Sequence, residues 1–322
     1  MKKIAVIGLG NISERHRGNL RRIFPDAKIY SMSASGRNPT SNVSNCDFLI
    51  PNIETLVKEN VDMAIVASPA TYHAEHSIPL IKAGIPILIE KPLAASIEDA
   101  EKILKISRDY ITPVAVGYCL RYLPSAQRVK EIIEAQELGE LYNVFIDVGQ
   151  YLPDWRPTKN YQESVSASVE LGGGALLELS HELDYAQWIL GNLTPKNSIL
   201  RSSEELSLKV EDLADICAIT ENGAVVNIHL DFLQRNTHRK CSFVGSKGRL
   251  EWNLIKNKIC FFDKKGMKVL YSDSNWDKNQ MYINMINDFV NKIESKNNRC
   301  INLENAVNTV RLIDCIKSIT NQ

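Results

Sequence analysis

The feature of this sequence that most constrains its fold is a glycine-rich turn close to the N-terminus. A short apolar run, residues 4–7, leads directly into Gly8-Leu9-Gly10-Asn11-Ile12-Ser13, and a helical pattern follows as far as Pro25. The apolar run predicts a strand buried on both faces of a parallel sheet. In this type of turn the first glycine permits the tight bend and the second lets backbone amides reach a pyrophosphate, whereas the third position needs only a small residue, here Ser13. We therefore expect cofactor contacts from Gly8, Gly10, Asn11 and Ile12.

The next part of the sequence repeats the alternation of buried strand and helix. Helices are predicted over residues 71–83, closed by Gly84, and after Ser96, an N-cap residue followed by acids in the first helical turn. Further buried strands are predicted over residues 28–31, 62–67, 86–90 and 114–118. This order and spacing indicate a doubly wound parallel sheet, in which ligands bind at the carboxyl ends of the strands. Candidate cofactor contacts at those ends are Ser33, Arg37, Ser68, Pro69, His73, Glu90 and Lys91.

The segment after the second strand bears on the choice of cofactor. An acidic residue there would bind the ribose 2′-hydroxyl of NAD, but residues 31–38 contain none. The hydroxyl of Ser33 and the guanidinium of Arg37 suit a 2′-phosphate instead. The sequence thus predicts NAD(P) binding with NADP favoured over NAD; the alternative is that Arg37 is only a loop charge.

A second informative stretch covers residues 172–191, where three glycines precede an amphipathic pattern. Helical spacing gives one apolar stripe, made by Leu176, Leu179, Leu183, Ala186 and Leu190. The opposite face carries Glu178, His181 and Asp184 together with Tyr185 and Trp188. Residues three apart are neighbours on a helix, so both carboxylates are within reach of the His181 imidazole. The alternative interpretation is a solvated face with a stray histidine.

Residues 150–171 form a long loop, and long loops within compact domains are often functional. Trp155 can stack on a sugar ring, and Arg156 and Lys159 can hold a carboxylate or phosphate. The alternative is a loop packed down by its own aromatic residues. Strands alternating with turns over residues 211–271 predict a meandering sheet, with Arg235 at the rim of the site. Helical patterns at 279–292 and 302–319 close the chain.

Composition limits the class of partner. The 38 basic and 38 acidic residues cancel, so neither nucleic acid nor an anionic membrane is an expected partner. The seven scattered cysteines lack Cys-x-x-Cys spacing, which argues against a disulfide framework and a metal site and fits a reducing cytosol. No stretch approaches the ~20 apolar residues of a membrane helix. We expect a cytoplasmic protein.

Four motifs together resemble the Gfo/Idh/MocA family of oxidoreductases: Gly8-Leu9-Gly10, Glu90-Lys91-Pro92, Gly117-Tyr118 with Arg121-Tyr122, and the 172–191 helix. The resemblance implies a Rossmann domain at residues 1–121. It also implies a second domain at 122–322 built on a large, open, mostly antiparallel sheet, whose C-terminal helix is a candidate to pack back on the first domain. Members are usually dimers or tetramers packed through that sheet.

The implied activity is hydride transfer between a nicotinamide and a hydroxyl or keto carbon of a sugar-like substrate. The family's catalytic lysine falls on Lys91 and its helix histidine on His181, while Asp184 matches an acid that often contacts substrate. Two positions depart from the family pattern: Glu178 precedes the histidine by three residues instead of an aspartate by four, and Cys119 replaces a frequent asparagine. Substrate contacts are expected from Lys91, Arg121, Trp155, Arg156, Lys159, Glu178, His181, Asp184 and Arg235.

In the hypothesis that follows, substrate lies between the nicotinamide and the 172–191 helix. His181 accepts the hydroxyl proton, and Lys91 donates a hydrogen bond to the same oxygen. The basic loop favours an anionic substrate, such as a sugar acid or a nucleotide sugar. Two alternatives stay open: an NAD-dependent glycoside hydrolase, and a non-enzymatic dinucleotide-sensing regulator.

Overall fold

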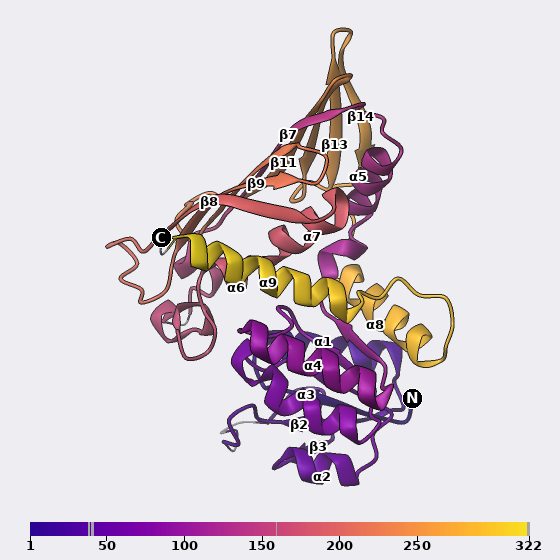
Figure 1. Ribbon diagram of the computed structural model, residues 1–322. Coiled ribbons are helices and arrows are strands. Elements are labelled where there is room, and N and C mark those ends of the chain that lie inside the picture. Colours follow the sequence, from indigo (N-terminus) through magenta and orange to yellow (C-terminus); the bar gives the residue numbers. More distant parts are fainter. Residues whose placement is uncertain (38, 40–41, 159, 321–322) are drawn as a thin grey trace. The chain divides into compact units, whose positions relative to one another are not determined.

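The computed structural model describes residues 1–37, 39, 42–158 and 160–320 (Figure 1). The chain divides into two compact units. The first unit comprises Met1–Cys119 and Asn279–Val310, and the second comprises Leu120–Lys278 and Arg311–Gln322. Each unit is built around a sheet of its own.

The sheet of the first unit has six parallel strands in the order β3-β2-β1-β4-β5-β6. Their bounds are β1 (Lys3–Ile7), β2 (Lys28–Met32), β3 (Phe48–Ile50), β4 (Met63–Val66), β5 (Ile87–Ile89) and β6 (Val114–Val116). Every residue of β4, β5 and β6 is buried, as the continuous apolar runs predict. The sequence did not predict β3, because this edge strand has only three residues and two of them are exposed. The predicted doubly wound sheet is confirmed.

Helices of the first unit follow the predicted positions, except α2, which the sequence did not predict. They are α1 (Asn11–Ile23), α2 (Ile53–Lys58), α3 (His73–Lys82), α4 (Ile97–Tyr110), α8 (Gln280–Ile293) and the start of α9 (Leu303–Thr320). A 3₁₀ turn, Ala70–Tyr72, precedes α3, and α3 continues through Pro79. The Ser96 hydroxyl accepts a hydrogen bond from the Asp99 amide at 3.2 Å and so caps α4, as the sequence predicts. Residues of α9 as far as Val310 join the apolar core around the parallel sheet.

The end of α4 is strained. Ile111 has a φ of 52° and 88% of its surface is exposed, so a β-branched residue occupies the left-handed region with little packing in return. We expect Ile111→Gly to raise the free energy of unfolding by about 1 kcal/mol, since glycine adopts this conformation without steric cost. Chemical denaturation measures the change. Ile111→Ala is the matched control: it keeps the Cβ and should gain much less, and an equal gain would contradict the strain.

The sheet of the second unit has eight strands in the order β14-β13-β12-β11-β7-β10-β9-β8. Their bounds are β7 (Leu141–Gly149), β8 (Leu193–Arg201), β9 (Leu213–Thr220), β10 (Val225–Asp231), β11 (His238–Gly245), β12 (Gly248–Asn253), β13 (Lys258–Asp263) and β14 (Gly266–Ser272). Only the β7–β10 pair is parallel, so the predicted mostly antiparallel sheet is confirmed. The sequence did not predict β8, because Pro195 and a register shift interrupt the alternation of buried and exposed residues in this strand.

Helices cover one face of this sheet, as Figure 1 shows for α5 (Pro124–Glu134), α7 (Ser180–Leu190) and the end of α9. Trp252 of β12 joins the helical layer to the sheet: its Nε1 donates to Ser125 at 2.8 Å, and its ring meets that of Tyr185 edge-on. The opposite face is open. Phe145 and Ile199 are about half exposed there, whereas the adjacent Val144, Ile146 and Ser198 are buried.

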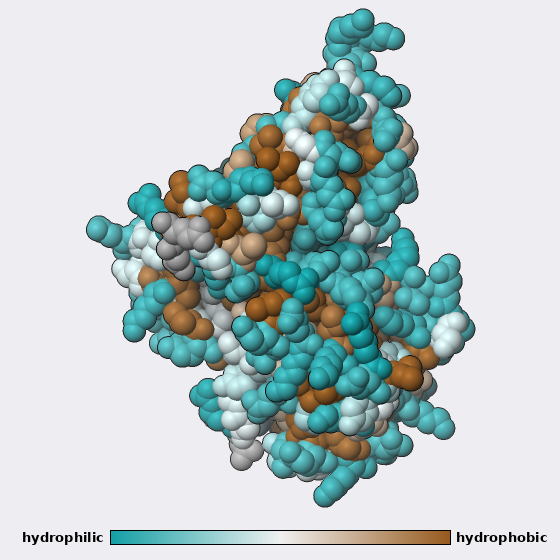
Figure 2. All heavy atoms as spheres, in the orientation of Figure 1, coloured by the Kyte–Doolittle hydropathy of each residue, from teal (hydrophilic) through white to brown (hydrophobic). Residues whose placement is uncertain are grey.

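The visible surface in Figure 2 is mainly hydrophilic, with hydrophobic residues in small groups. Among the helices in the described part of the chain, none combines the length and the apolar character that crossing a lipid bilayer requires.

On the open face of the second sheet, His229 lies between two carboxylates, 2.7 Å from Asp215 and 2.8 Å from Asp231. The hydrogen bond to Asp231, with help from Asp215, raises the pKa of His229 to about 9, although burial opposes the shift. Because this pKa exceeds the unfolded value of about 6.5, the stabilisation is fully present below about pH 6.5 and is lost as the pH rises through about 9.

We expect His229→Gln to lower the free energy of unfolding by about 1 kcal/mol near pH 6, a modest value because solvent screens this half-exposed group. Near pH 10 the difference from the wild type should be close to zero. Chemical denaturation at both pH values measures it, and equal losses at the two would contradict the assignment.

Candidate functional site

In the first unit, the glycine turn packs against the end of β4. Gly8 has a φ of +111°, and a Cβ at this position would lie 2.5 Å from the Ala67 carbonyl oxygen, so only glycine fits. The Ser13 hydroxyl donates to the same carbonyl oxygen at 3.1 Å and is fully buried. Serine thus provides the close helix–strand packing predicted for the third position of the motif.

The N-terminus of α1 follows this turn and is suited to an anion. Gly10 is the N-cap residue, without a side chain to cap the first amides, and Asn11 beside it is exposed. The first amides of a helix lack intrahelical partners, and the helix dipole favours negative charge at this end. The residues present therefore fit the pyrophosphate of a dinucleotide. Gly8, Gly10, Asn11 and Ile12 are the residues that would hold it.

Glu90 and Lys91 follow β5 directly, at the same edge of the sheet as the glycine turn. The Glu90 carboxylate contacts the His16 Nε2 at 2.7 Å and accepts a hydrogen bond from the Lys91 amide at 3.1 Å. Burial alone would raise the pKa of Glu90, but the hydrogen bond from His16 and the charges of His16 and Lys91 hold it below its usual value. The Lys91–Pro92 peptide bond is cis, and Lys91 itself is half-buried.

Ser68 and His73 connect the ends of β4 and β5. The His73 ring is 1% exposed: its Nε2 lies 2.9 Å from the Ser68 carbonyl oxygen and its Nδ1 lies 2.9 Å from that of Pro92. Burial lowers the pKa of His73, although these carbonyls oppose the shift. The structure therefore gives His73 a packing role. Cofactor contacts from Ser68, Pro69 and His73 remain predictions.

The two residues behind the predicted NADP preference follow β2. Ser33 is half-buried, whereas Arg37 is exposed and donates from its Nε to the Ser35 hydroxyl at 3.1 Å. Contact between Arg37 and a 2′-phosphate therefore remains a prediction.

In the second unit, residues 172–191 form two helices, α6 (Ala175–Glu178) and α7 (Ser180–Leu190), and not the single helix that the sequence predicts. The break lies at Leu179, whose carbonyl accepts from the Glu182 amide, three residues along, at 3.2 Å. Leu179 and Ser180 are both buried, so tertiary packing overrides the continuous helical pattern.

The faces of this segment also differ from the prediction. The apolar stripe is buried as expected except at Leu190, which is half-buried. Asp184 and Tyr185, assigned to the opposite face, are each only 1% exposed. The alternative of a solvated face is therefore wrong for these two residues. His181 and Glu178 are half-buried.

Asp184 forms a bidentate ion pair with Arg121. The guanidinium Nε and Nη2 donate to the two carboxylate oxygens at 2.9 and 2.7 Å, and both side chains are buried. Burial raises the pKa of Asp184, although Arg121 opposes the shift. The guanidinium carbon also lies 5.4 Å from the centre of the Trp188 ring. The structure thus brings together three residues that the sequence analysis singled out.

The glycines before α6 approach protein groups. A Cβ at Gly173 would lie 2.6 Å from the Ser166 carbonyl oxygen, which accepts from the Gly174 amide at 3.0 Å. A Cβ at Gly174 would lie 2.4 Å from the Glu211 carboxylate. These contacts join the long loop to the segment that carries His181.

The loop over residues 150–171 contains 3₁₀ turns at Leu152–Trp155, Tyr161–Glu163 and Val165–Ala167. It encloses a cavity of about 470 Å³, and Trp155 and Arg156 are among the residues that line it. The Trp155 Nε1 donates to the Gln150 carbonyl at 3.2 Å and its ring packs edge-on against Phe232, as in the alternative of aromatic packing. Arg156 is exposed, and Lys159 lies outside the described residues.

Arg235 lies with a different set of residues. Its guanidinium pairs with Glu205 and covers the Tyr151 ring, with 3.6 Å between the guanidinium carbon and the ring centre. The structure therefore places this exposed arginine at the start of the long loop, without bringing it to Asp184 or Arg121.

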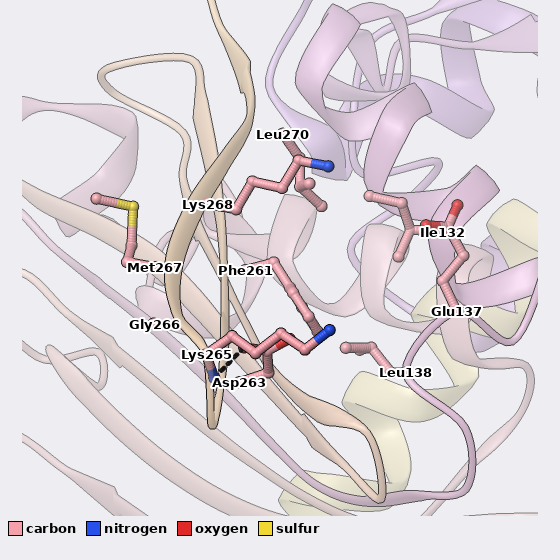
Figure 3. Close-up of a pocket in the computed structure, with 10 residues that line it drawn as sticks. All are labelled: Ile132, Glu137, Leu138, Phe261, Asp263, Lys265, Gly266, Met267, Lys268 and Leu270. Atoms are coloured by element: carbon pink, nitrogen blue, oxygen red, sulfur yellow. Dashed lines mark hydrogen bonds between the residues drawn. The ribbon is translucent and has the colours of Figure 1, made fainter.

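A second cavity of about 380 Å³ lies between the end of α5 and the β13–β14 hairpin (Figure 3). Apolar side chains of Ile132, Leu138, Phe261 and Leu270 line it together with Glu137, Asp263, Lys265 and Lys268. Its lining residues do not include any of the predicted site residues in the described part of the chain, so this cavity is separate from the predicted site.

Two polar side chains next to the predicted site residues, His16 and Glu182, were not identified from the sequence. His16 lies on α1, 74 residues before Glu90 in the sequence, so only the fold reveals their contact. Glu182, adjacent to His181, is fully buried, and Arg239 of β11 binds both of its carboxylate oxygens at 2.7 and 2.9 Å. Glu182 falls on the apolar side of the helical pattern. An acidic residue at such a position was the feature of the sequence that could have identified it as a buried, paired group.

Comparison with known proteins agrees with this architecture. The family model described as an oxidoreductase family with an NAD-binding Rossmann fold matches residues 2–118. The GFO/IDH/MocA C-terminal domain model matches residues 126–251.

Similar proteins include sugar and inositol dehydrogenases. Glucose-6-phosphate 3-dehydrogenase of Bacillus subtilis is 25% identical over 236 residues, which cover 71% of this chain and 67% of that protein. Inositol 2-dehydrogenase 3 of Saccharopolyspora erythraea is 24% identical over 254 residues, covering 76% and 71%. The crystal structure of the WlbA dehydrogenase from Bordetella pertussis, in complex with NADH and UDP-GlcNAcA, matches with a TM-score of 0.84 at 19% identity over 99% of this chain and 96% of that one. The two family models together span most of the sequence, and the chain belongs to the Gfo/Idh/MocA family of NAD-binding oxidoreductases.

Proposed function

We propose that this protein transfers a hydride between NAD(P) and a hydroxyl or keto carbon of a sugar or sugar derivative. The observation that carries the proposal is the turn Glu90-Lys91-Pro92, held by the hydrogen bond from the Lys91 amide to the Glu90 carboxylate, at the same sheet edge as the glycine turn that fits a pyrophosphate. An oxidoreductase of this type needs both features: a cradle for the cofactor and a cation where negative charge develops on substrate oxygen.

The proposed mechanism assigns one role to each of two side chains. The bound nicotinamide supplies the hydride acceptor or donor. During oxidation, His181 accepts the proton of the substrate hydroxyl as a general base. Lys91 donates a hydrogen bond to the same oxygen and so stabilises the charge that develops there. In the opposite direction His181 returns the proton.

The remaining predicted residues are proposed to hold the substrate. Arg121, held by Asp184, offers a positive group in a buried setting, and Glu178 is proposed to accept hydrogen bonds from substrate hydroxyls. Further substrate contacts are proposed from Trp155, Arg156 and Lys159 of the long loop. Arg235, which covers Tyr151 at the start of that loop, is proposed to contact substrate as well.

We propose an anionic substrate, such as a sugar acid or a nucleotide sugar. The basic residues of the long loop support this class. So does the presence of UDP-GlcNAcA, a nucleotide sugar, in the structurally similar WlbA dehydrogenase. A glucose-6-phosphate 3-dehydrogenase among the relatives, named for a phosphorylated sugar, fits the same class.

For the cofactor we propose NADP over NAD, because residues 31–38 lack an acid and contain Ser33 and Arg37. Parallel fluorescence titrations with NADPH and NADH test this choice. We expect tighter binding of NADPH, and Arg37→Ala should remove the difference. Tighter binding of NADH, the cofactor bound in the WlbA structure, would refute the preference and leave the proposed reaction standing.

We also propose assembly into a dimer or tetramer through the sheet of the second unit. The half-exposed Phe145, Ile199 and Met267 on that sheet support an interface of this kind. Light scattering coupled to size exclusion measures the mass, and a monomer at micromolar concentration would contradict the proposal.

A further inference from the structure

A buried contact between two side chains joins α1 to the residue before Lys91. The His16 ring is fully buried and its Nε2 lies 2.7 Å from the Glu90 carboxylate. Glu90 is 7% exposed; burial raises its pKa, but the hydrogen bond from His16, together with the charges of His16 and Lys91, outweighs this and holds the pKa below its usual value. A buried charge is costly without a partner, so this contact is a strong constraint on where the Glu90 side chain lies.

The other oxygen of the same carboxylate holds the catalytic turn. It accepts a hydrogen bond from the Lys91 backbone amide at 3.1 Å. Gly117, directly after β6, lies close against the Glu90 side chain: a Cβ at this position would be 3.2 Å from the Glu90 carboxyl group. The carboxylate is thus enclosed between His16, the Lys91 amide and Gly117, and has little room to move.

Residues at the start of α8 pack against His16 and its neighbours on α1. The Tyr282 ring meets the His16 ring edge-on with 6.0 Å between centres, and the Arg15 guanidinium carbon lies 4.8 Å from the centre of the Tyr282 ring. Asn19, one turn further along α1, exchanges two amide hydrogen bonds with Asn279. The segment that begins at Asn279 therefore stabilises the position of α1, the helix that carries His16.

We propose that His16 and Glu90 are positioning residues for Lys91. Through the Glu90 carboxylate, His16 fixes the backbone from which the Lys91 amine is directed, and so sets the rate of the proposed hydride transfer. This inference rests on the proposed function. The expected effect is on kcat, because a displacement of about 1 Å at a reacting group costs about 100-fold in rate.

The test compares two amide side chains that differ in reach. In His16→Gln the amide nitrogen can replace the Nε2 and still donate to Glu90, whereas His16→Asn is one methylene too short. We expect kcat to fall about 10- to 100-fold in H16N and to recover to within about threefold of the wild type in H16Q, with NADPH affinity little changed in both.

Asn19→Ala is the matched control for general loosening. It removes both hydrogen bonds to Asn279 from the same pair of helices without touching Glu90. We expect a lower melting temperature with kcat close to that of the wild type. Equal rates in H16N and H16Q, or the same loss of rate in N19A as in H16N, would overturn the proposal.

Hydrogen exchange of the Lys91 amide gives a readout that does not depend on turnover. Loss of the Glu90 anchor should speed this exchange about tenfold or more in H16N but not in H16Q or N19A. If the wild type turns over none of the tested sugars yet the exchange pattern holds, the proposed function fails and the positioning stands. If turnover occurs and exchange is the same in all variants, the positioning fails alone.

Discussion

Replacement of Lys91 by methionine is expected to lower kcat at least about 100- to 1000-fold, the loss seen when one donor to a developing oxyanion is removed. Methionine is unbranched and similar in length, so the neighbouring packing should persist. Affinity for NADPH should change little, because the glycine turn and the N-terminus of α1 are proposed to supply the main contacts. Steady-state kinetics and a fluorescence titration measure the two quantities separately.

Lys82→Met is the matched control for Lys91→Met. Lys82 is an exposed lysine of α3 in the same unit, and its loss should leave kcat unchanged. Survival of turnover in the Lys91 variant, at more than about a tenth of the wild-type rate, would refute the assigned role of this residue in charge stabilisation.

The second large effect is expected on stability. Arg239→Met should lower the free energy of unfolding by about 3 kcal/mol or more, because it removes the guanidinium that forms a bidentate ion pair with the fully buried Glu182 carboxylate. In a chain of this size such a loss corresponds to a melting temperature lower by about 10 °C. Calorimetry or circular dichroism measures the shift.

The matched comparison is the double variant Glu182→Met/Arg239→Met. Because apolar side chains of similar volume often replace a buried ion pair without net cost, the double variant should recover most of the stability lost in R239M. If the losses of stability in the single variants Glu182→Met and Arg239→Met instead add up in the double variant, the pair contributes packing and not charge compensation.

Local patterns explain which elements the sequence predicts. The glycine turn, the buried strand β4 and the Ser96 cap each depend on residues close together in the chain, so short-range rules suffice. The elements that were missed lack such a pattern. β3 is short and half exposed at the sheet edge, and Pro195 interrupts β8.

The errors in the 172–191 segment have a tertiary cause. Periodicity predicts one helix, but the structure breaks it at Leu179, where two consecutive residues are buried. Periodicity also predicts a polar face around His181, yet Asp184 is buried against Arg121, 63 residues earlier in the chain. Partners so distant in sequence leave no local signal.

The same reasoning applies to the candidate site. The motif Glu90-Lys91-Pro92 is visible in the sequence because its residues are adjacent, whereas the His16 that holds Glu90 depends on how α1 crosses the sheet. Residues 279–310 belong to the first unit. Their helical pattern alone does not indicate which sheet they join, and only the family resemblance made the C-terminal helix a candidate to pack on the first domain. The division of the chain at residue 121 stays a prediction.

The central claim is net hydride transfer, and product analysis tests it most directly. The protein is incubated with NADP and a panel of sugar acids and nucleotide sugars, while the absorbance of reduced nicotinamide and the sugar products are followed together. We expect reduced nicotinamide and oxidised sugar in equal amounts, and the loss of both in Lys91→Met. Release of a free sugar without net reduction of the cofactor would contradict the central claim and indicate the glycoside hydrolase instead.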